Sequence, residues 1–143
     1  MKRTLLSILA AVLAFGLVGC GDEGKSMATT EGNATCDLNA HACVASLKGK
    51  EIKFDVTPKP LYPMSPFTLR ITGLGEGYKA LNVRIYGLNM DMGVVRAELE
   101  RRGSTYMGQI VLSSCVTEVM NYRMEIYDGD KPLGVFIDFD LKG

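Results

Sequence analysis

Sulfur-bearing side chains are the residues of this chain best suited to chemistry, and two of them share a short loop. Met90 and Met92 stand in the segment Gly87–Gly93, which reads GLNMDMG. Residues i and i+2 of an extended backbone point the same way, so both thioethers can face one ion. Thioethers are soft ligands that suit Cu(I). The spacing therefore favours a copper(I) site, and the alternative is that the methionines are adaptable apolar caps on the end of the fold.

Cys115 is the second candidate, and counting the cysteines singles it out. The chain has four cysteines, of which Cys20 is expected to carry a lipid, as argued below. Cys36 and Cys43 have six residues between them and most simply form a disulfide, which stabilises a fold by about 2–3 kcal/mol for a loop of this size. Cys115 is then an odd cysteine, which in an exported protein indicates a reactive thiol, a metal ligand or an intermolecular bond. A buried small hydrophobe is the alternative.

Three further residues are candidates for metal binding. Met120 lies on the inward face of an expected strand and near its end, so a place in the core and a place beside the ion both stay open. Met64 could complete a sulfur-rich site. His41 could bind metal together with Cys36 and Cys43, but their spacing is not a common zinc pattern. An oxidising compartment favours the disulfide instead.

Enzymatic machinery is not expected. The chain has one histidine, so a Ser/His/Asp set would depend on His41, and no pair of carboxylates stands out as an acid–base site. Asp138 and Asp140 are expected on the solvated face of the last strand. Basic and acidic residues number 16 each, and without a basic patch nothing indicates nucleic-acid binding. The composition is that of a binding or structural protein.

The N-terminus has the three parts of a secretory signal. Lys2 and Arg3 precede an apolar run that ends in Leu17-Val18-Gly19-Cys20. Small residues directly before a cysteine resemble a bacterial lipoprotein signal, in which residues 1–19 are removed and a lipid is attached to Cys20. An ordinary signal peptide and a short membrane anchor are the alternatives. The run of about 14 residues is shorter than the roughly 20 that a spanning helix needs.

A lipid on Cys20 would make the membrane the first partner of this chain. Two or more acyl chains hold a protein stably at a bilayer, so the domain is expected in the cell envelope on the periplasmic side. Gly21 follows the cysteine, which by resemblance to Gram-negative lipoproteins favours the outer membrane and says nothing in a Gram-positive cell. Residues 20–35, rich in Gly, Ser, Thr and Asn, read as a flexible tether whose ends lie about 20 Å apart.

From Cys43 onward apolar and polar residues alternate, which is the pattern of half-buried strands. The apolar sets are Ile52/Phe54/Val56, Phe67/Leu69/Ile71, Leu81/Val83/Ile85, Val95/Ala97/Leu99, Tyr106/Gly108/Ile110/Leu112, Met120/Tyr122/Met124/Ile126 and Leu133/Val135/Ile137/Phe139/Leu141. The first set is expected to pair with residues 44–47. Seven or eight short strands at this spacing predict an all-β fold over residues 36–143, an antiparallel β-sandwich of immunoglobulin-like or cupredoxin-like type.

The short turns between the expected strands place the candidate residues in space. If successive strands run antiparallel, the loop 87–93, the loop 113–118 and the proline-rich connection around Met64 all fall at one end of the sandwich. We therefore expect Met64, Met90, Met92 and Cys115 to cluster there.

The sulfur residues belong to a wider pattern. Its members are Met90, Met92, Gly93, Tyr106, Gly108, Leu112, Cys115 and Met120. This Met-x-Met-Gly, Tyr-x-Gly, Leu-x-x-Cys arrangement resembles a group of small bacterial periplasmic lipoproteins, some of which accompany copper delivery to respiratory oxidases. The resemblance spans roughly residues 36–127 and implies that Cys36 and Cys43 pair. The chain has Ser113 and Tyr122 where the group has proline and tryptophan, and neither change removes a sulfur.

Two hypotheses of function follow. The first is a lipid-anchored copper-handling module, in which Met90, Met92, Cys115 and Met120 bind Cu(I) and pass it to a copper-delivery protein or an oxidase. The second is a structural or protein-binding lipoprotein without metal, in which Tyr62 and the methionines contact a protein partner. A redox role for Cys115 is a weaker third, because no resolving cysteine stands nearby in the sequence.

Overall fold

The computed structural model describes residues 28–29, 35–115 and 118–143. The expected signal peptide at residues 1–19, the lipidation site Cys20 and most of the expected tether lie outside these ranges. Every regular element within the ranges is a strand, which confirms the all-β fold. No helix there has the length and hydropathy required to span a bilayer.

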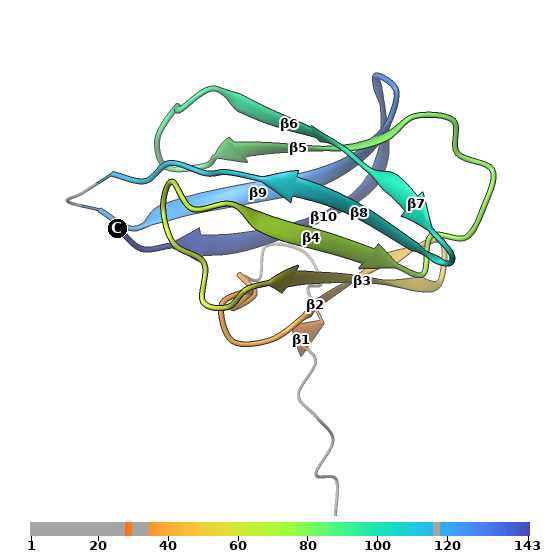
Figure 1. The fold of residues 1–143 in the computed structure, drawn as a ribbon, viewed down its shortest axis with the longest axis horizontal. Helices are drawn as coiled ribbons and strands as arrows, with labels where there is room; N and C mark the ends of the chain where they lie inside the picture. The colour runs from red at the N-terminus through yellow and green to blue at the C-terminus, as the bar shows by residue number, and fades with distance from the viewer. Residues whose placement is uncertain (1–27, 30–34, 116–117) are drawn as a thin grey trace, which may run out of the picture.

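Ten strands follow one another along the described residues (Figure 1). In chain order they are β1 (Ala28–Thr29), β2 (Cys43–Leu47), β3 (Lys50–Thr57), β4 (Phe67–Thr72), β5 (Leu81–Gly87), β6 (Val94–Glu98), β7 (Glu100–Arg102), β8 (Thr105–Ile110), β9 (Met120–Asp128) and β10 (Lys131–Leu141). The two-residue β1 falls in the segment that the sequence assigns to the tether. It pairs in parallel with the start of β2, where Ala28 lies opposite Cys43.

Two sheets form an immunoglobulin-like sandwich. One has the order β1-β2-β3-β4-β8-β7 and the other the order β10-β9-β5-β6. Every pairing except β1 with β2 is antiparallel. Immunoglobulin-like domains pack a sheet A-B-E-D on a sheet C-F-G. Strands β3-β4-β8-β7 and β5-β9-β10 reproduce this order, with β6 added beside β5 and β2 added before β3.

The core lies between the sheets and is built from the alternating residues of the sequence. Side chains that are at most 1% exposed include Ile52, Phe54, Val56, Leu69, Ile71, Val83, Ile85, Met124, Ile126, Ile137 and Phe139. The pairing of residues 44–47 with β3 is also as predicted. Burying a Val, Leu, Ile, Phe or Met side chain contributes about 1.5–3 kcal/mol, so burial of this set contributes a large part of the free energy that favours folding.

One expected strand is in fact two. The sequence predicts a single strand through Val95, Ala97 and Leu99, but β6 pairs with β5 in one sheet while β7 pairs with β8 in the other. The crossover occurs at Leu99, whose amide donates to the carbonyl of Leu81. The alternation of apolar and polar residues does not reveal this change of sheet, because Leu99 is still on the inward side where the chain crosses from one sheet to the other.

Asp138 corrects a second expectation. The sequence places it on a solvated face, but it is only 5% exposed. Arg123 on β9 donates to both carboxylate oxygens, from Nε at 2.8 Å and from Nη2 at 2.9 Å. These hydrogen bonds raise the pKa of Arg123 above its ordinary value. The amide of Cys36 also donates to the carbonyl of Asp138, so the N-terminal segment covers this part of β10.

The strand directions bring several connections to one end of the sandwich, on the left in Figure 1. We call it the methionine end and define it as residues 58–66, 88–94, 111–115, 118–119 and 142–143. Met64 N donates to Leu112 O at 2.7 Å, which joins two of these connections, and Leu88 N donates to Asn121 O of β9 at 2.7 Å. The connections that carry Met64, Met90, Met92 and Cys115 therefore lie at one end of the sandwich, as predicted.

Tyr122 fastens the β8–β9 connection to the core. Its ring is 2% exposed and stacks on Phe139 with ring centroids 5.9 Å apart. Its hydroxyl donates to the carbonyl of Ser113 at 2.5 Å. Immunoglobulin-like domains commonly carry a tyrosine at this position, where its hydroxyl bonds back to the upstream backbone. Tyr122 thus has a structural role in the sandwich.

Candidate functional site

The loop that carries Met90 and Met92 is held by Asn89. The side-chain amide of Asn89 donates to the carbonyl of Val119 at 2.8 Å, and its oxygen accepts from the amide of Asn121 at 2.9 Å. Within the loop, Gly93 N donates to Asp91 Oδ1 at 3.0 Å. We call residues 87–93 the methionine loop. Its hydrogen bonds hold it against the start of β9 and fix its own backbone near Gly93.

Gly87 allows the loop to fold back tightly. A Cβ at this position would lie 2.1 Å from the carbonyl oxygen of Met90, which no real side chain tolerates. The same Cβ would lie 3.1 Å from Cε of Met120. The backbone of Met90 and the side chain of Met120 therefore meet at Gly87, one from the loop and one from the core.

The four predicted ligands differ in their exposure. Met120 is fully buried at 0%, Met90 is partly buried against the core, and Met92 is 41% exposed. Cys115 is partly buried and also packs against the core. Its carbonyl lies beside Gly143, where a Cβ would come within 2.7 Å of it. The structure thus brings the backbone of Met90 and the side chain of Met120 together at Gly87, while Met92 lies two residues further along the same loop and Cys115 lies beside Gly143.

The remaining candidates lie apart from this group. Met64 is at the methionine end but points into solvent, with 71% of its side chain exposed. His41 is half-buried and its Nδ1 lies 3.0 Å from the carbonyl of Ala42. In the described ranges, no three side chains of the His, Cys, Asp and Glu types form a group that could hold a metal.

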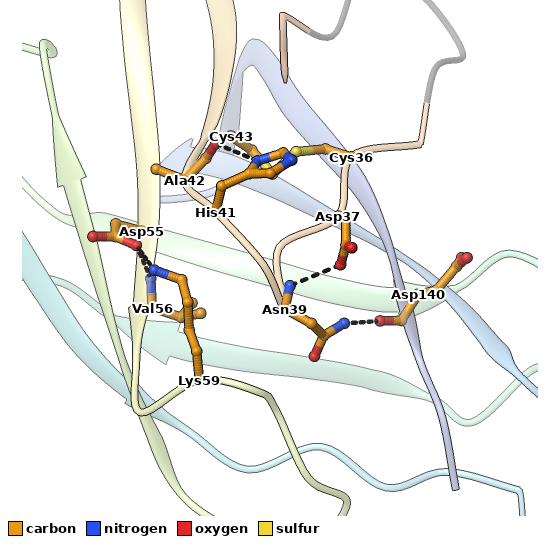
Figure 2. The surroundings of a disulfide bond; sticks show 10 residues. All are labelled: Cys36, Asp37, Asn39, His41, Ala42, Cys43, Asp55, Val56, Lys59 and Asp140. Carbon is orange, nitrogen blue, oxygen red and sulfur yellow. Dashed lines mark hydrogen bonds and ion pairs between the residues drawn. A yellow bond between two sulfur atoms is a disulfide. The ribbon is translucent and has the colours of Figure 1, made fainter. Parts of the chain in front are cut away.

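The Cys36–Cys43 disulfide is confirmed, with Cα atoms 6.1 Å apart (Figure 2). Both sulfurs are engaged, which excludes the alternative metal site with His41. The loop that the disulfide closes carries Asn39, whose amide donates to Asp140 O at 3.0 Å and whose oxygen accepts from Leu61 N at 2.9 Å. The disulfide loop therefore positions both the proline-rich connection and the last residues of β10.

A cavity of about 660 Å³ lies between these three segments. Its walls include Asp37 and Asn39 from the disulfide loop, Leu61 and Tyr62 from the proline-rich connection, and Lys142 from the terminus. Its volume falls within the ordinary range for small-ligand sites. Cys36 of the disulfide also lines it, and its lining includes none of the four predicted copper ligands.

Exposed apolar side chains gather at the methionine end. The large hydrophobic residues that the structure leaves exposed, across its described ranges, are Tyr62, Met64, Leu88, Met92, Val94, Val111 and Val119. Each belongs to a connection at this end or to the strand residue that adjoins it. Single exposed apolar residues are ordinary, whereas contiguous apolar patches are typical of interaction surfaces.

The sequence left Asn89, Gly87 and Asn39 without a role. Asparagine in a loop commonly bonds to nearby backbone, and this tendency is the one signal that pointed to Asn89. Its partners lie 30 and 32 residues away, and those of Asn39 lie 22 and 101 residues away. Separations of this size are not readable from one sequence.

Replacing Asn89 with alanine tests whether the methionine loop is preorganised. We expect Asn89→Ala to lower the free energy of unfolding by only about 1 kcal/mol, since the bonds that it removes are exposed to water. Backbone amides of residues 88–93 should exchange with solvent markedly faster. Asn89→Asp keeps the acceptor for Asn121 and loses the donor to Val119, so it should be intermediate. Exchange rates in Asn89→Ala equal to those of the parent chain would contradict this account.

Comparisons with known proteins add no relative: no protein-family model, no curated protein and no solved structure matches this chain.

Proposed function

We propose that this chain is a lipid-anchored protein of the cell envelope that binds Cu(I) and hands it on to another protein. The observation that supports this most is the Met-x-Met loop, fastened by Asn89 to the start of β9. Methionine side chains are flexible, so a loop that presents two of them from a fixed backbone lowers the ordering cost of binding. Copper is the cargo in this proposal.

Each candidate ligand has a distinct place in the proposed site. Met92 is the exposed thioether that first meets the ion, and Met90 is the partly buried one. Met120 offers sulfur from the core side, because its Cε lies under Gly87. Cys115 adds a thiolate from the neighbouring connection. Soft sulfur donors select Cu(I) over harder ions, and exposure on one side leaves a route for the ion to leave.

A copper titration tests the proposal directly. We expect the chain from residue 20 on, carrying Cys20→Ser, to take one Cu(I) from a chromogenic chelator under reducing, oxygen-free conditions. The double variant Met90→Leu/Met92→Leu keeps the volume and apolar character of both side chains. Its affinity should fall by more than about 100-fold, since losing even an indirect support of a metal ligand costs 10–100-fold.

Controls separate this result from a general loss of sulfur. Met107 is a half-buried methionine on β8, away from the methionine end, so Met107→Leu should bind copper like the parent chain. Cys115→Ser should weaken binding and leave the thioethers in place. Equal copper affinity in the parent chain and in Met90→Leu/Met92→Leu would refute the proposed site.

The second candidate function is a protein-binding lipoprotein without metal. The gathering of exposed apolar residues at the methionine end favours it, because such patches mark interaction surfaces. The copper titration discriminates the two: no uptake from the chelator would leave this second function in place. A thiol at Cys115 that reacts only after denaturation, and is not protected by Cu(I), would support it further.

A further inference from the structure

The exposed apolar residues of the methionine end come from three separate connections and from the first residue of β6. Tyr62 and Met64 belong to the proline-rich connection, and Leu88 and Met92 to the methionine loop. Val111 and Val119 flank the β8–β9 connection, and Val94 begins β6. Their exposed fractions run from 41% to 71%. Within the described ranges, all the exposed large apolar side chains therefore lie at one end of the sandwich, and the others are buried or partly buried.

The position of β1 limits how far this end can lie from the predicted anchor. Ala28 pairs with Cys43, which pairs with Phe54, three residues before β3 ends at Thr57. Three strand residues span about 10 Å. Cys20 precedes Ala28 by eight residues, and eight residues reach at most about 29 Å when fully extended. A lipid on Cys20 therefore keeps the methionine end within reach of the bilayer.

The charges of this end indicate which force would act there. Its exposed charged residues are Lys59, Asp91, Glu118 and Lys142, two of each sign. Such a balance gives no net attraction to anionic lipid headgroups and no repulsion from them. Contact with a bilayer would then depend on apolar insertion, with Tyr62 suited to the interface because tyrosine has an apolar ring and a polar tip.

We propose that the methionine end docks onto the lipid bilayer, with its exposed apolar side chains among the headgroups. This inference rests on the lipid anchor of the proposed function and is independent of copper. Tethering raises the effective concentration of the end at the surface to the millimolar range, so weak partitioning is enough to keep it docked.

A tryptophan reporter tests the docking, because the chain has no tryptophan of its own. Leu88→Trp places the reporter at the methionine end, and Ser104→Trp places it on the exposed turn at the opposite end. The full lipidated chain, without metal, is reconstituted into vesicles of phosphatidylcholine with brominated acyl chains. Mass spectrometry first verifies the lipid on Cys20.

The expected result is a difference between the two reporters. Leu88→Trp should shift to shorter wavelength and lose about half of its emission or more, since an inserted side chain sits roughly 5–10 Å into the interface, next to the bromines. Ser104→Trp should behave as it does in lipid-free solution. Raising the salt concentration should leave the difference unchanged, because the charges balance.

Several outcomes would overturn the inference. Equal quenching of both reporters would show that no end is preferred. A blue shift that grows with protein density but is not quenched by bromine would identify a second copy as the occupant. An unmodified Cys20 would remove both this inference and the anchor. The added pair Met90→Leu/Met92→Leu should keep the quenching of Leu88→Trp, which separates a failure of docking from a failure of copper binding.

Discussion

Replacing Arg123 with alanine is expected to lower the free energy of unfolding by about 3 kcal/mol, which is the lower end of the range for breaking a buried ion pair. Asp138 is 5% exposed and would be left without its two hydrogen bonds from the guanidinium. Arg123 also lies over the ring of Phe136, 4.0 Å from its centroid. The lower end applies because Arg123 is itself a quarter exposed. Urea unfolding of the two chains measures the difference.

Two comparisons show whether burial is the cause. Arg96 pairs with Glu98 on the exposed face of β6, so Arg96→Ala should cost well under about 1 kcal/mol. Adding Asp138→Asn to Arg123→Ala should recover part of the loss, because a neutral amide is less costly to leave buried than a carboxylate. A loss in Arg123→Ala no greater than that in Arg96→Ala would contradict the role of the buried carboxylate.

Removing the disulfide should have an effect of similar size. Cys36→Ser/Cys43→Ser opens an eight-residue loop, for which the chain-entropy model gives about 2.5 kcal/mol. Both positions are at most 1% exposed, so two hydroxyls would replace a buried apolar bridge and add to the cost. For a domain of this size the thermal midpoint should fall by about 10 °C. Differential scanning calorimetry gives the value.

Reductant provides the control for this variant. The parent chain under reducing conditions should unfold near the midpoint of Cys36→Ser/Cys43→Ser, and the variant should not respond to reductant. Because the disulfide loop carries Asn39, the contacts of Asn39 with Leu61 and Asp140 should loosen as well. A midpoint in the variant equal to that of the parent chain would contradict a stabilising role for the disulfide.

The sequence predicted the layers of the fold because burial in a sandwich follows the period of a strand. Phe67, Leu69 and Ile71 alternate with polar residues, and all three are buried at 4% or less. The same reasoning fails for Asp138, which has the phase of a solvated residue but is covered by Arg123 and by the segment that begins at Thr35. Alternation tells which face a residue occupies, and it does not tell what lies over that face.

The candidate site was predictable in its place and less so in its construction. Strand counting brought Met90, Met92 and Cys115 to one end, since antiparallel connections alternate between the two ends of a sandwich. The sequence does not decide whether Met120 is buried, because a residue at the start of a strand can pack in the core or lie at the end of the sandwich. Asn89 fixes the loop through hydrogen bonds to residues 30 and 32 positions away. Contacts at such separations cannot be predicted from the pattern of one sequence.

The contact between Gly143 and the carbonyl of Cys115 has a practical consequence for anyone who purifies this protein. A Cβ at position 143 would come within 2.7 Å of that oxygen and 3.1 Å of Ser114 Oγ. Any affinity tag or fluorescent fusion joined after Gly143 would start from this crowded spot and extend across the methionine end. A fusion partner at this position would therefore lie beside the sulfur residues and hinder their access to any ligand.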